Sequence, residues 1–164
     1  SARRGPVDPA ERSRRISPVR ALWALVLAQE KRSKMRASVR ARNRGMVVVC
    51  DRYPQAQIMG FNDGPLLSGW LESPSRLRRR LARWEFETYR ELARTAPDLV
   101  VKMDVPPEVA VERKPDMQPD EVERRRAAVR QIDYGPGSET LSVDGARPLP
   151  EVLLRVRRAI WQLL

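Results

Sequence analysis

The sequence predicts an α/β fold in which a parallel sheet is flanked by helices. Two runs dominated by apolar residues, at positions 46–50 and 99–105, are typical of strands that are buried on both faces of a sheet. Helical periodicity separates these runs, and a weaker third strand is predicted at residues 140–144. Strands that alternate with helices form right-handed crossovers in a parallel sheet. We therefore expect one domain over residues 17–164, preceded by a flexible basic leader or loop at residues 1–16.

The first helix is predicted to begin at Ser17 and Pro18, which stand where an N-cap and a first helical residue belong. The segment from Lys31 to Arg44 is mostly basic, which indicates an exposed surface, and Gly45 provides a stop signal. The larger apolar residues of this helix fall on one face at helical spacing: Val19, Leu22, Trp23, Val26 and Leu27.

Four later segments also predict helices. The first two cover residues 74–95 and 107–114, and Pro107 stands at an early helical position, where its missing N–H is not needed. Residues 119–132 form a highly charged helix. Residues 150–163 have an amphipathic pattern, which indicates a closing helix that covers the sheet.

Composition excludes several kinds of chemistry within this chain. It has no histidine and a single cysteine, Cys50, so Ser-His-Asp catalysis, His-ligated zinc and an internal disulfide are excluded. Any reaction must use carboxylates, arginines, lysines and backbone groups. No apolar run reaches the roughly 18 residues that a membrane span needs, and the first residues lack the apolar core of a signal peptide. We expect a cytoplasmic protein without a membrane span.

Basic residues are concentrated toward the N-terminal end. Residues 1–45 contain 13 Lys and Arg against 3 Asp and Glu; with totals of 32 and 21, the remaining residues contain 19 against 18. This excess would suit a surface for nucleic acid or an acidic protein partner. Blocks of like charge are more often solvated faces, so a nucleic-acid partner is the less favoured expectation.

An acid and a base follow the first predicted strand directly. In an open parallel sheet, ligands bind at the carboxyl ends of the strands, which is where Asp51 and Arg52 stand. A carboxylate there can hold Mg²⁺ directly or through water, and a guanidinium can clamp a phosphate with two hydrogen bonds. The alternative is a strand-end ion pair with Tyr53 as an aromatic plug.

A basic segment lies between the second and third predicted strands. A mobile, arginine-bearing lid in this segment would neutralise charge on a transferring phosphoryl group. A solvated helix face is the alternative. Its members are Arg113, Lys114, Arg124, Arg125, Arg126 and Arg130.

Four motifs in order resemble the carboxyl-terminal two-thirds of a P-loop nucleotide kinase of the thymidylate kinase type. They are "VVVCDRY", "PDLVVKMDVPPEVAVERK", the arginine-rich segment and "LSVDGARPLPEVLLRV", and the match covers roughly residues 17–164. The resemblance implies a three-layer α/β/α fold that transfers the γ-phosphoryl group of Mg-ATP to a nucleoside monophosphate. It also implies a homodimer paired through helices, for which the Trp23 face would serve. The segment "GFNDGP" is unlike the usual acceptor region, so another small acceptor is an open alternative.

The resemblance also assigns roles to individual residues. Arg52 would contact the phosphate of the acceptor, and Asp51 would lie near the magnesium. The acceptor site would be lined by Tyr53, Gln57, Asn62 and Asp63. The lid over the donor phosphates would comprise Arg113, Lys114, Arg130 and the catalytic arginines Arg124, Arg125 and Arg126. The turn at Gly145 and Arg147 would pack against the adenine, mainly through backbone; a plain strand-to-helix turn is the alternative there.

The chain departs from this family in one respect. A P-loop kinase needs the motif Gly-x-x-x-x-Gly-Lys-Ser/Thr, and none of the four lysines here follows a glycine. No strand that would carry such a loop precedes the first predicted helix. We expect that the first strand, the P-loop and the first helix lie outside this sequence. The alternative is a degenerate relative that retains the scaffold as a non-catalytic module binding nucleic acid or protein.

Overall fold

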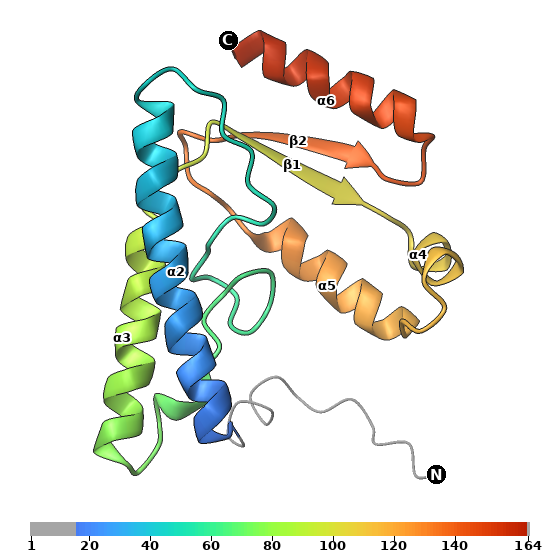
Figure 1. Cartoon of the computed structure of the whole chain (residues 1–164). Coiled ribbons are helices and arrows are strands. Elements are labelled where there is room, and N and C mark those ends of the chain that lie inside the picture. Colours follow the sequence, from blue (N-terminus) through green and yellow to red (C-terminus); the bar gives the residue numbers. More distant parts are fainter. Residues whose placement is uncertain (1–15, 164) are drawn as a thin grey trace. The chain divides into compact units, whose positions relative to one another are not determined.

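The computed structural model describes residues 16–163, and the chain divides into two compact units, residues 1–95 and 96–164 (Figure 1). All but the last residue of the leader predicted at 1–16 lies outside the described residues. The first unit contains α2 (Pro18–Arg42), the short 3-10 helix η1 (Ser68–Trp70) and α3 (Arg76–Leu92). The second contains β1 (Leu99–Asp104), α4 (Pro107–Arg113), α5 (Pro119–Gln131), β2 (Glu139–Asp144) and α6 (Leu149–Leu163).

Helix α2 begins and ends where the sequence predicts. The Ser17 hydroxyl accepts a hydrogen bond from the backbone N–H of Arg20 at 3.3 Å, which satisfies one of the free amides of the first turn. At the other end, Gly45 adopts a left-handed φ of 78° and donates its N–H to the carbonyl of Arg42 at 2.9 Å. Both end signals are therefore confirmed.

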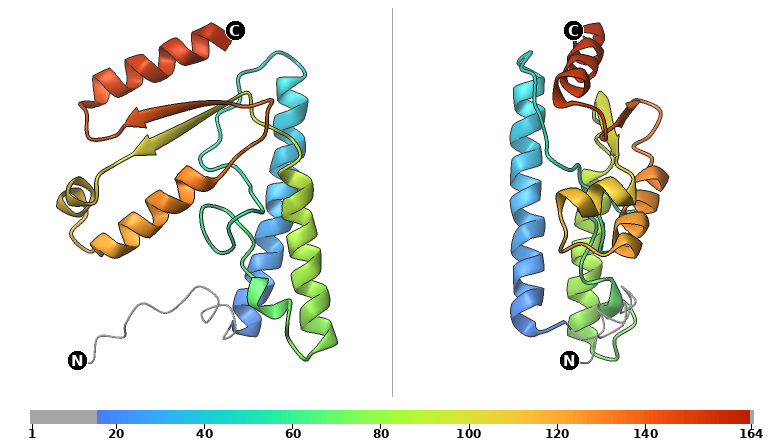
Figure 2. Two further views of the ribbon diagram at one scale, coloured as in Figure 1. Left: turned by 180° about the vertical axis from the view of Figure 1, so that it is seen from behind. Right: turned by 90° about the vertical axis from the view of Figure 1, so that its right-hand side faces the viewer.

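The core of the first unit lies where α2 and α3 run side by side (Figures 1 and 2). Small side chains let the two helices approach closely, with Ala21 and Ala24 on α2 and Ala82 on α3. Leu67, just before η1, and Trp70, within η1, pack beside these alanines. The helix pair is therefore held by alanine contacts and by two large side chains from the intervening segment.

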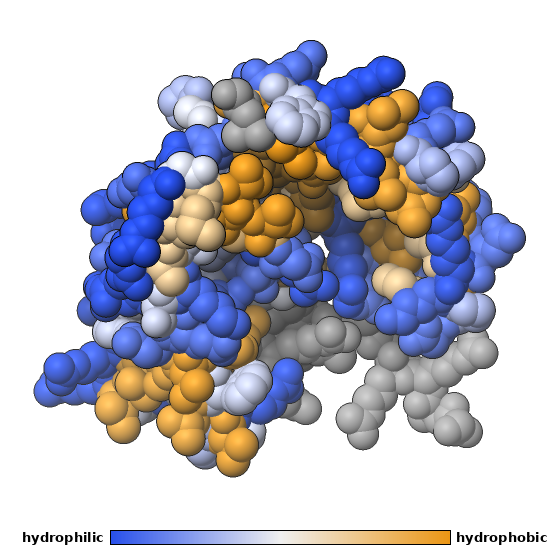
Figure 3. All heavy atoms as spheres, turned by 45° about the horizontal axis from the view of Figure 1, so that its top comes forward, coloured by the Kyte–Doolittle hydropathy of each residue, from blue (hydrophilic) through white to orange (hydrophobic). Residues whose placement is uncertain are grey.

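The larger apolar stripe of α2 is not the buried one. Val19 and Trp23 are 77% and 61% exposed, whereas Ala21, Ala24 and Ala28 are almost fully buried. Apolar patches also reach the surface in the space-filling view (Figure 3). Within residues 16–163, no helix combines the length and the apolar character that a membrane crossing requires.

The strand predicted at residues 46–50 is wrong. This segment has no regular structure in the described chain, and Val49 is 86% exposed. A strand exists only when a neighbouring strand pairs with its backbone, and within residues 16–163 no segment pairs with this one. The apolar run alone did not reveal that a partner was missing.

The second unit is a parallel sheet flanked by helices, as the sequence predicts. β1 and β2 pair in parallel from Leu99 opposite Glu139 to Asp104 opposite Asp144. Side chains alternate between the two faces, so one face turns toward α5 and the other toward α6 (Figure 1). The arrangement is a small α/β/α sandwich, compatible with the fold of P-loop kinases.

A buried carboxylate joins α3 to the segment that precedes η1. Glu85 is fully buried, and its two oxygens accept the backbone N–H groups of Leu66 at 3.0 Å and Leu67 at 2.7 Å. Burial raises the pKa of Glu85 above its ordinary value, and the two backbone hydrogen bonds only partly oppose that rise.

The raised pKa of Glu85 predicts that the protein loses stability as the pH rises. A carboxyl group whose pKa is higher in the folded chain favours folding when protonated. Its contribution is therefore complete below the ordinary value of 4.5 and is lost as the pH rises through the raised value. We expect urea unfolding, followed by tryptophan fluorescence, to show this decline in the wild type and not in Glu85→Gln. Parallel curves for the two proteins above pH 4.5 would contradict the burial argument.

Candidate functional site

The acid and base that follow the apolar run are free in the first unit. Asp51 and Arg52 are exposed, and neither side chain has an ion-pair partner among residues 16–163, so they do not form a strand-end ion pair. Arg52 has a φ of 63°, a left-handed conformation that costs a non-glycine residue roughly 1–2 kcal/mol. The chain therefore holds a charged, unpaired side chain in a strained backbone conformation.

Tyr53 has a structural contact of its own. Its hydroxyl donates a hydrogen bond to the carbonyl oxygen of Thr95 at 2.6 Å and lies 3.5 Å from the sulfur of Met35. These contacts attach the segment after Arg52 to the end of α3 and to α2. The predicted role of Tyr53 in an acceptor site stays a prediction.

The loop that follows is built around the buried side chain of Gln55. Its amide nitrogen donates to the carbonyls of Ile58 at 2.7 Å and Phe61 at 2.8 Å. Its oxygen accepts the backbone N–H groups of Gln57 at 2.8 Å and Ile58 at 2.7 Å. All four hydrogen-bonding positions of the amide are used, which holds the loop in one conformation.

The second half of this loop is tied to α2. Asn62 and Asp63 both have left-handed φ angles, and the Asp63 carboxylate forms an ion pair with Lys31. The ammonium of Lys31 also lies 6.0 Å from the ring centre of Tyr89, at the edge of cation–π range. Burial, and secondarily the carboxylates of Glu85 and Asp63, raise the pKa of Tyr89 above its ordinary value. Of the predicted acceptor residues, Gln57 is exposed and Asp63 is engaged with Lys31.

The second unit contains a carboxylate held by two guanidiniums. Asp104 ends β1; it accepts hydrogen bonds from both Nε and a terminal nitrogen of Arg126, the latter at 2.9 Å, and from Arg130 at 2.7 Å. Arg126, and then Arg130, hold the pKa of Asp104 well below its usual range. The carboxylate is therefore ionised throughout the neutral range. Arg126 also pairs with Glu123 at 3.4 Å, so two carboxylates and two guanidiniums meet near the carboxyl end of β1.

The other predicted lid residues have different surroundings. Arg125 pairs with Glu121 one turn earlier on α5 at 2.6 Å, and Arg113 donates to the carbonyl of Gly145 at 2.8 Å. Arg124 and Lys114 are exposed, and within residues 16–163 their side chains have no hydrogen-bond or ion-pair partner.

A cavity of about 260 Å³ lies between α5 and the sheet. Its lining includes Asp104, Arg126 and Arg130, which we call the Asp104 cluster. Val122 and Val129 of α5 form part of its apolar lining. Lys102 lies on the same face and donates to the carbonyl of Ile132 at 2.6 Å, which ties the end of α5 to β1. The cavity is therefore lined by both charged and apolar side chains.

The turn after β2 is tightly packed. Gly145 is buried and donates its N–H to the carbonyl of Asp104 at 2.7 Å. A Cβ at this position would lie 2.6 Å from a methyl carbon of Val105, so only glycine fits. Arg147 pairs with Glu151 at 3.4 Å and with Asp144 at 3.7 Å.

Asp51 offers a carboxylate that could take part in holding a magnesium ion. The described part of the chain contains no cluster of three or more acidic, cysteine or histidine side chains. Mg²⁺ at phosphate-transfer sites is usually held by one or two carboxylates together with substrate phosphates and water, so it needs no such cluster. The exposed, unpaired carboxylate of Asp51 fits that requirement.

Sequence reasoning missed three residues of this arrangement: Asp104, Lys31 and Glu85. Asp104 is an acid at the end of β1, a position that resembles the one predicted for Asp51. Arg126 and Arg130 are four residues apart and therefore share one helix face, which was a usable signal. No local pattern indicated that Lys31 and Glu85 would reach the loop before η1.

Comparison with known proteins found two kinds of curated relative. The chain is 32% identical over 145 residues to a protein of Escherichia coli strain K12 named "Uncharacterized ATP-binding protein YghR". The match covers 85% of this chain and 57% of that protein. It is 30% identical over 153 residues to "Uncharacterized ATP-binding protein YghS" of the same strain, covering 89% of this chain and 61% of that protein. The chain thus spans about three-fifths of the length of these relatives. No family model and no solved structure matches the chain.

The loop around Gln55 makes Gly64 irreplaceable. A Cβ at Gly64 would lie 2.1 Å from the carbonyl oxygen of Ile58 and 2.5 Å from the side-chain nitrogen of Gln55. We expect Gly64→Ala to lower the free energy of unfolding by more than about 1 kcal/mol, because the Gln55 hydrogen bonds must break or shift.

Gly137→Ala is the matched control, because its added Cβ would meet nothing closer than Ala96 at 3.8 Å. Chemical denaturation of both variants measures the difference. Equal unfolding free energies for the two variants would show that the Gln55 loop yields without cost.

Proposed function

We propose that this protein is an ATP-dependent phosphotransferase of the P-loop nucleotide kinase type, similar to thymidylate kinase. It would move the γ-phosphoryl group of Mg-ATP to a nucleoside monophosphate or another small acceptor. The observation that carries this proposal is the pair of guanidiniums, Arg126 and Arg130, held at the carboxyl end of β1 by Asp104. The ATP-binding names of the relatives support the choice of nucleotide.

In this proposal, Asp104 is the ion-pair partner of the two arginines when no phosphate is bound. Arg126 already makes a bidentate contact with this carboxylate, and the same planar guanidinium can bind a phosphate in the same way. Glu123 also pairs with Arg126 at 3.4 Å, so a phosphate would compete with two carboxylates for the two guanidiniums. Phosphoryl transfer depends mainly on positioning and charge neutralisation, which suits a site built of arginines.

Asp51 and Arg52 would form the acceptor side. The strained φ of Arg52 and its unpaired guanidinium indicate a residue placed for a ligand and not for folding. Arg52 would bind the acceptor phosphate, with Gln57 and Asn62 as further candidates. Asp51 would hold Mg²⁺ directly or through water, and the ion would supply neutralisation of phosphate charge.

On the donor side, the buried turn at Gly145 would pack against the adenine through its backbone. Arg113, whose guanidinium already binds the Gly145 carbonyl, stands at the same turn. The proposed activity also requires a P-loop, which these 164 residues lack. It is therefore the activity of a protein that supplies that loop in addition to this chain.

A second candidate is a non-catalytic module that binds nucleic acid or an acidic protein. Exposed arginines on α2, such as Arg36 and Arg40, favour it, as does the absence of a P-loop from the sequence. Binding of arbitrary DNA that weakens steeply with salt would support this candidate, since phosphate contacts release counterions. Nucleotide binding that requires Mg²⁺ and Arg52 would oppose it.

Phosphoryl transfer from ATP to a panel of nucleoside monophosphates tests the proposal. The assay uses the protein of the complete reading frame that contains these residues, compared with residues 1–164 alone. We expect transfer by the former that depends on Mg²⁺ and is selective for one acceptor. A folded protein from that frame without transfer to any nucleotide would contradict the proposal.

Replacing Arg52 separates its binding role from its strain. Arg52→Gly removes the guanidinium and relieves the left-handed conformation, so the free energy of unfolding should stay unchanged or rise by up to about 1 kcal/mol. The kcat/KM for the acceptor should fall by about tenfold or more, because a charged hydrogen bond is lost. The KM for ATP should not change.

The matched control is Arg83→Ala, which removes an exposed arginine from α3 in the same unit. Its acceptor kinetics should equal those of the wild type. Unchanged acceptor kinetics in Arg52→Gly would remove Arg52 from the site.

A further inference from the structure

We propose that the cavity between β2 and α6 binds an amphipathic organic anion, with a planar apolar body and one phosphate or carboxylate head. The guanidiniums on which this proposal rests, Arg155 and Arg158, take no part in the proposed phosphoryl transfer. The cavity measures about 430 Å³, which lies within the usual range of roughly 300–1,000 Å³ for small-molecule sites. It is the larger of the two hollows described in the second unit.

The walls of the cavity are apolar where the sheet meets the helix. Leu141 and Val143 of β2 form the floor, and Val152 and Ala159 of α6 lie on the other side. Ala159 has the smallest side chain of the lining, so a larger side chain at this position would reduce the space. A flat apolar body placed there would be removed from water on two sides.

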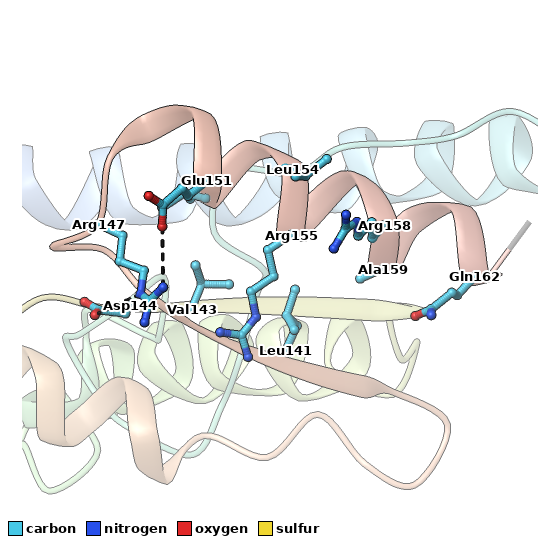
Figure 4. A pocket seen from close by; sticks show the side chains of 11 residues that line it. Leu141, Val143, Asp144, Arg147, Glu151, Leu154, Arg155, Arg158, Ala159 and Gln162 are labelled. Atoms are coloured by element: carbon cyan, nitrogen blue, oxygen red, sulfur yellow. Dashed lines mark hydrogen bonds and ion pairs between the residues drawn. The ribbon is translucent and has the colours of Figure 1, made fainter.

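Two unpaired guanidiniums of α6 line the cavity. Arg155 extends from α6 toward the sheet, between Val143 and Leu141, and Arg158 lies closer to the helix (Figure 4). Within residues 16–163, neither has an ion-pair or hydrogen-bond partner. Residues three apart lie on the same side of a helix, so an anion in the cavity can draw on both guanidiniums. The amide of Gln162 adds a further donor to the lining.

A third guanidinium of the lining is already paired. Arg147 contacts two carboxylates, Glu151 at 3.4 Å and Asp144 at 3.7 Å (Figure 4). The guanidiniums of the lining that have no carboxylate partner among residues 16–163 are therefore Arg155 and Arg158. A ligand with one anionic head and an apolar body fits this lining, because planar guanidiniums bind phosphate or carboxylate through two hydrogen bonds.

The test is a titration of the ¹⁵N-labelled full chain at fixed ionic strength, with phenyl phosphate as the probe. The backbone amide chemical shifts of Leu141, Val143 and Ala159 should change as the probe is added. Inorganic phosphate has the anionic head without the apolar body, so its affinity should be lower than that of phenyl phosphate by at least about tenfold. Benzoate in a parallel titration distinguishes a carboxylate head from a phosphate head, because the tighter of the two identifies the preferred group.

Three variants separate the site from general charge effects. Arg155→Ala combined with Arg158→Ala should weaken phenyl phosphate by about tenfold or more. Arg157→Ala removes the same charge from the same helix but does not line the cavity, so it should bind like the wild type. Ala159→Leu keeps every charge and fills the space, so it should also abolish binding.

Four outcomes would overturn the proposal: no localised chemical-shift changes in the wild type, equal losses in Arg157→Ala and the double variant, equal affinity for inorganic phosphate, or full binding by Ala159→Leu. None of these results bears on phosphoryl transfer, which depends on other residues. The dispersion of each variant's amide spectrum shows whether it is folded.

Discussion

The bonds from Asp104 to Arg126 and Arg130 organise the second unit. They fasten α5 to the end of β1, and the parallel register with β2 places Asp104 opposite Asp144. The turn at Gly145 then closes so tightly over the strand end that a single methyl group would not fit. Because the two guanidiniums lower the pKa of Asp104, this arrangement carries its full charge at neutral pH. The same arrangement is what we propose to use for phosphate.

In the first unit, buried polar side chains hold the long connection between α2 and α3 in place. The amide of Gln55 uses all its hydrogen-bonding positions within the loop, and Glu85 accepts the two backbone N–H groups before η1. Lys31 holds Asp63 from the side of α2. Buried polar groups with all partners in place rigidify a structure, so residues carried by this loop have defined positions. Arg52, just before it, combines strain with a free charge, the pattern expected of a ligand-binding residue.

The sequence predicted the elements whose signals are local. Caps and periodicity located the five α-helices of residues 16–163, the apolar run located β1, and a weaker pattern located β2. It failed at residues 46–50, because a strand depends on a partner that a single segment cannot reveal. It also favoured the large side chains around Trp23 over the alanines that pack, since burial depends on the distance between helices. The site was predicted in part: Arg126 and Arg130 were named, but the tertiary contact that brings Asp104 to them has no local signal.

The most direct test of the central claim is the affinity for Mg-ATP, measured by calorimetry on the protein of the complete reading frame. Arg126→Gln is compared with Arg157→Gln, which removes an exposed arginine from α6 in the same unit. If the arginine pair receives the donor phosphates, Arg126→Gln binds Mg-ATP about tenfold more weakly and Arg157→Gln binds like the wild type. Equal affinity in both folded variants would contradict the account and leave the Asp104 cluster with a purely structural role.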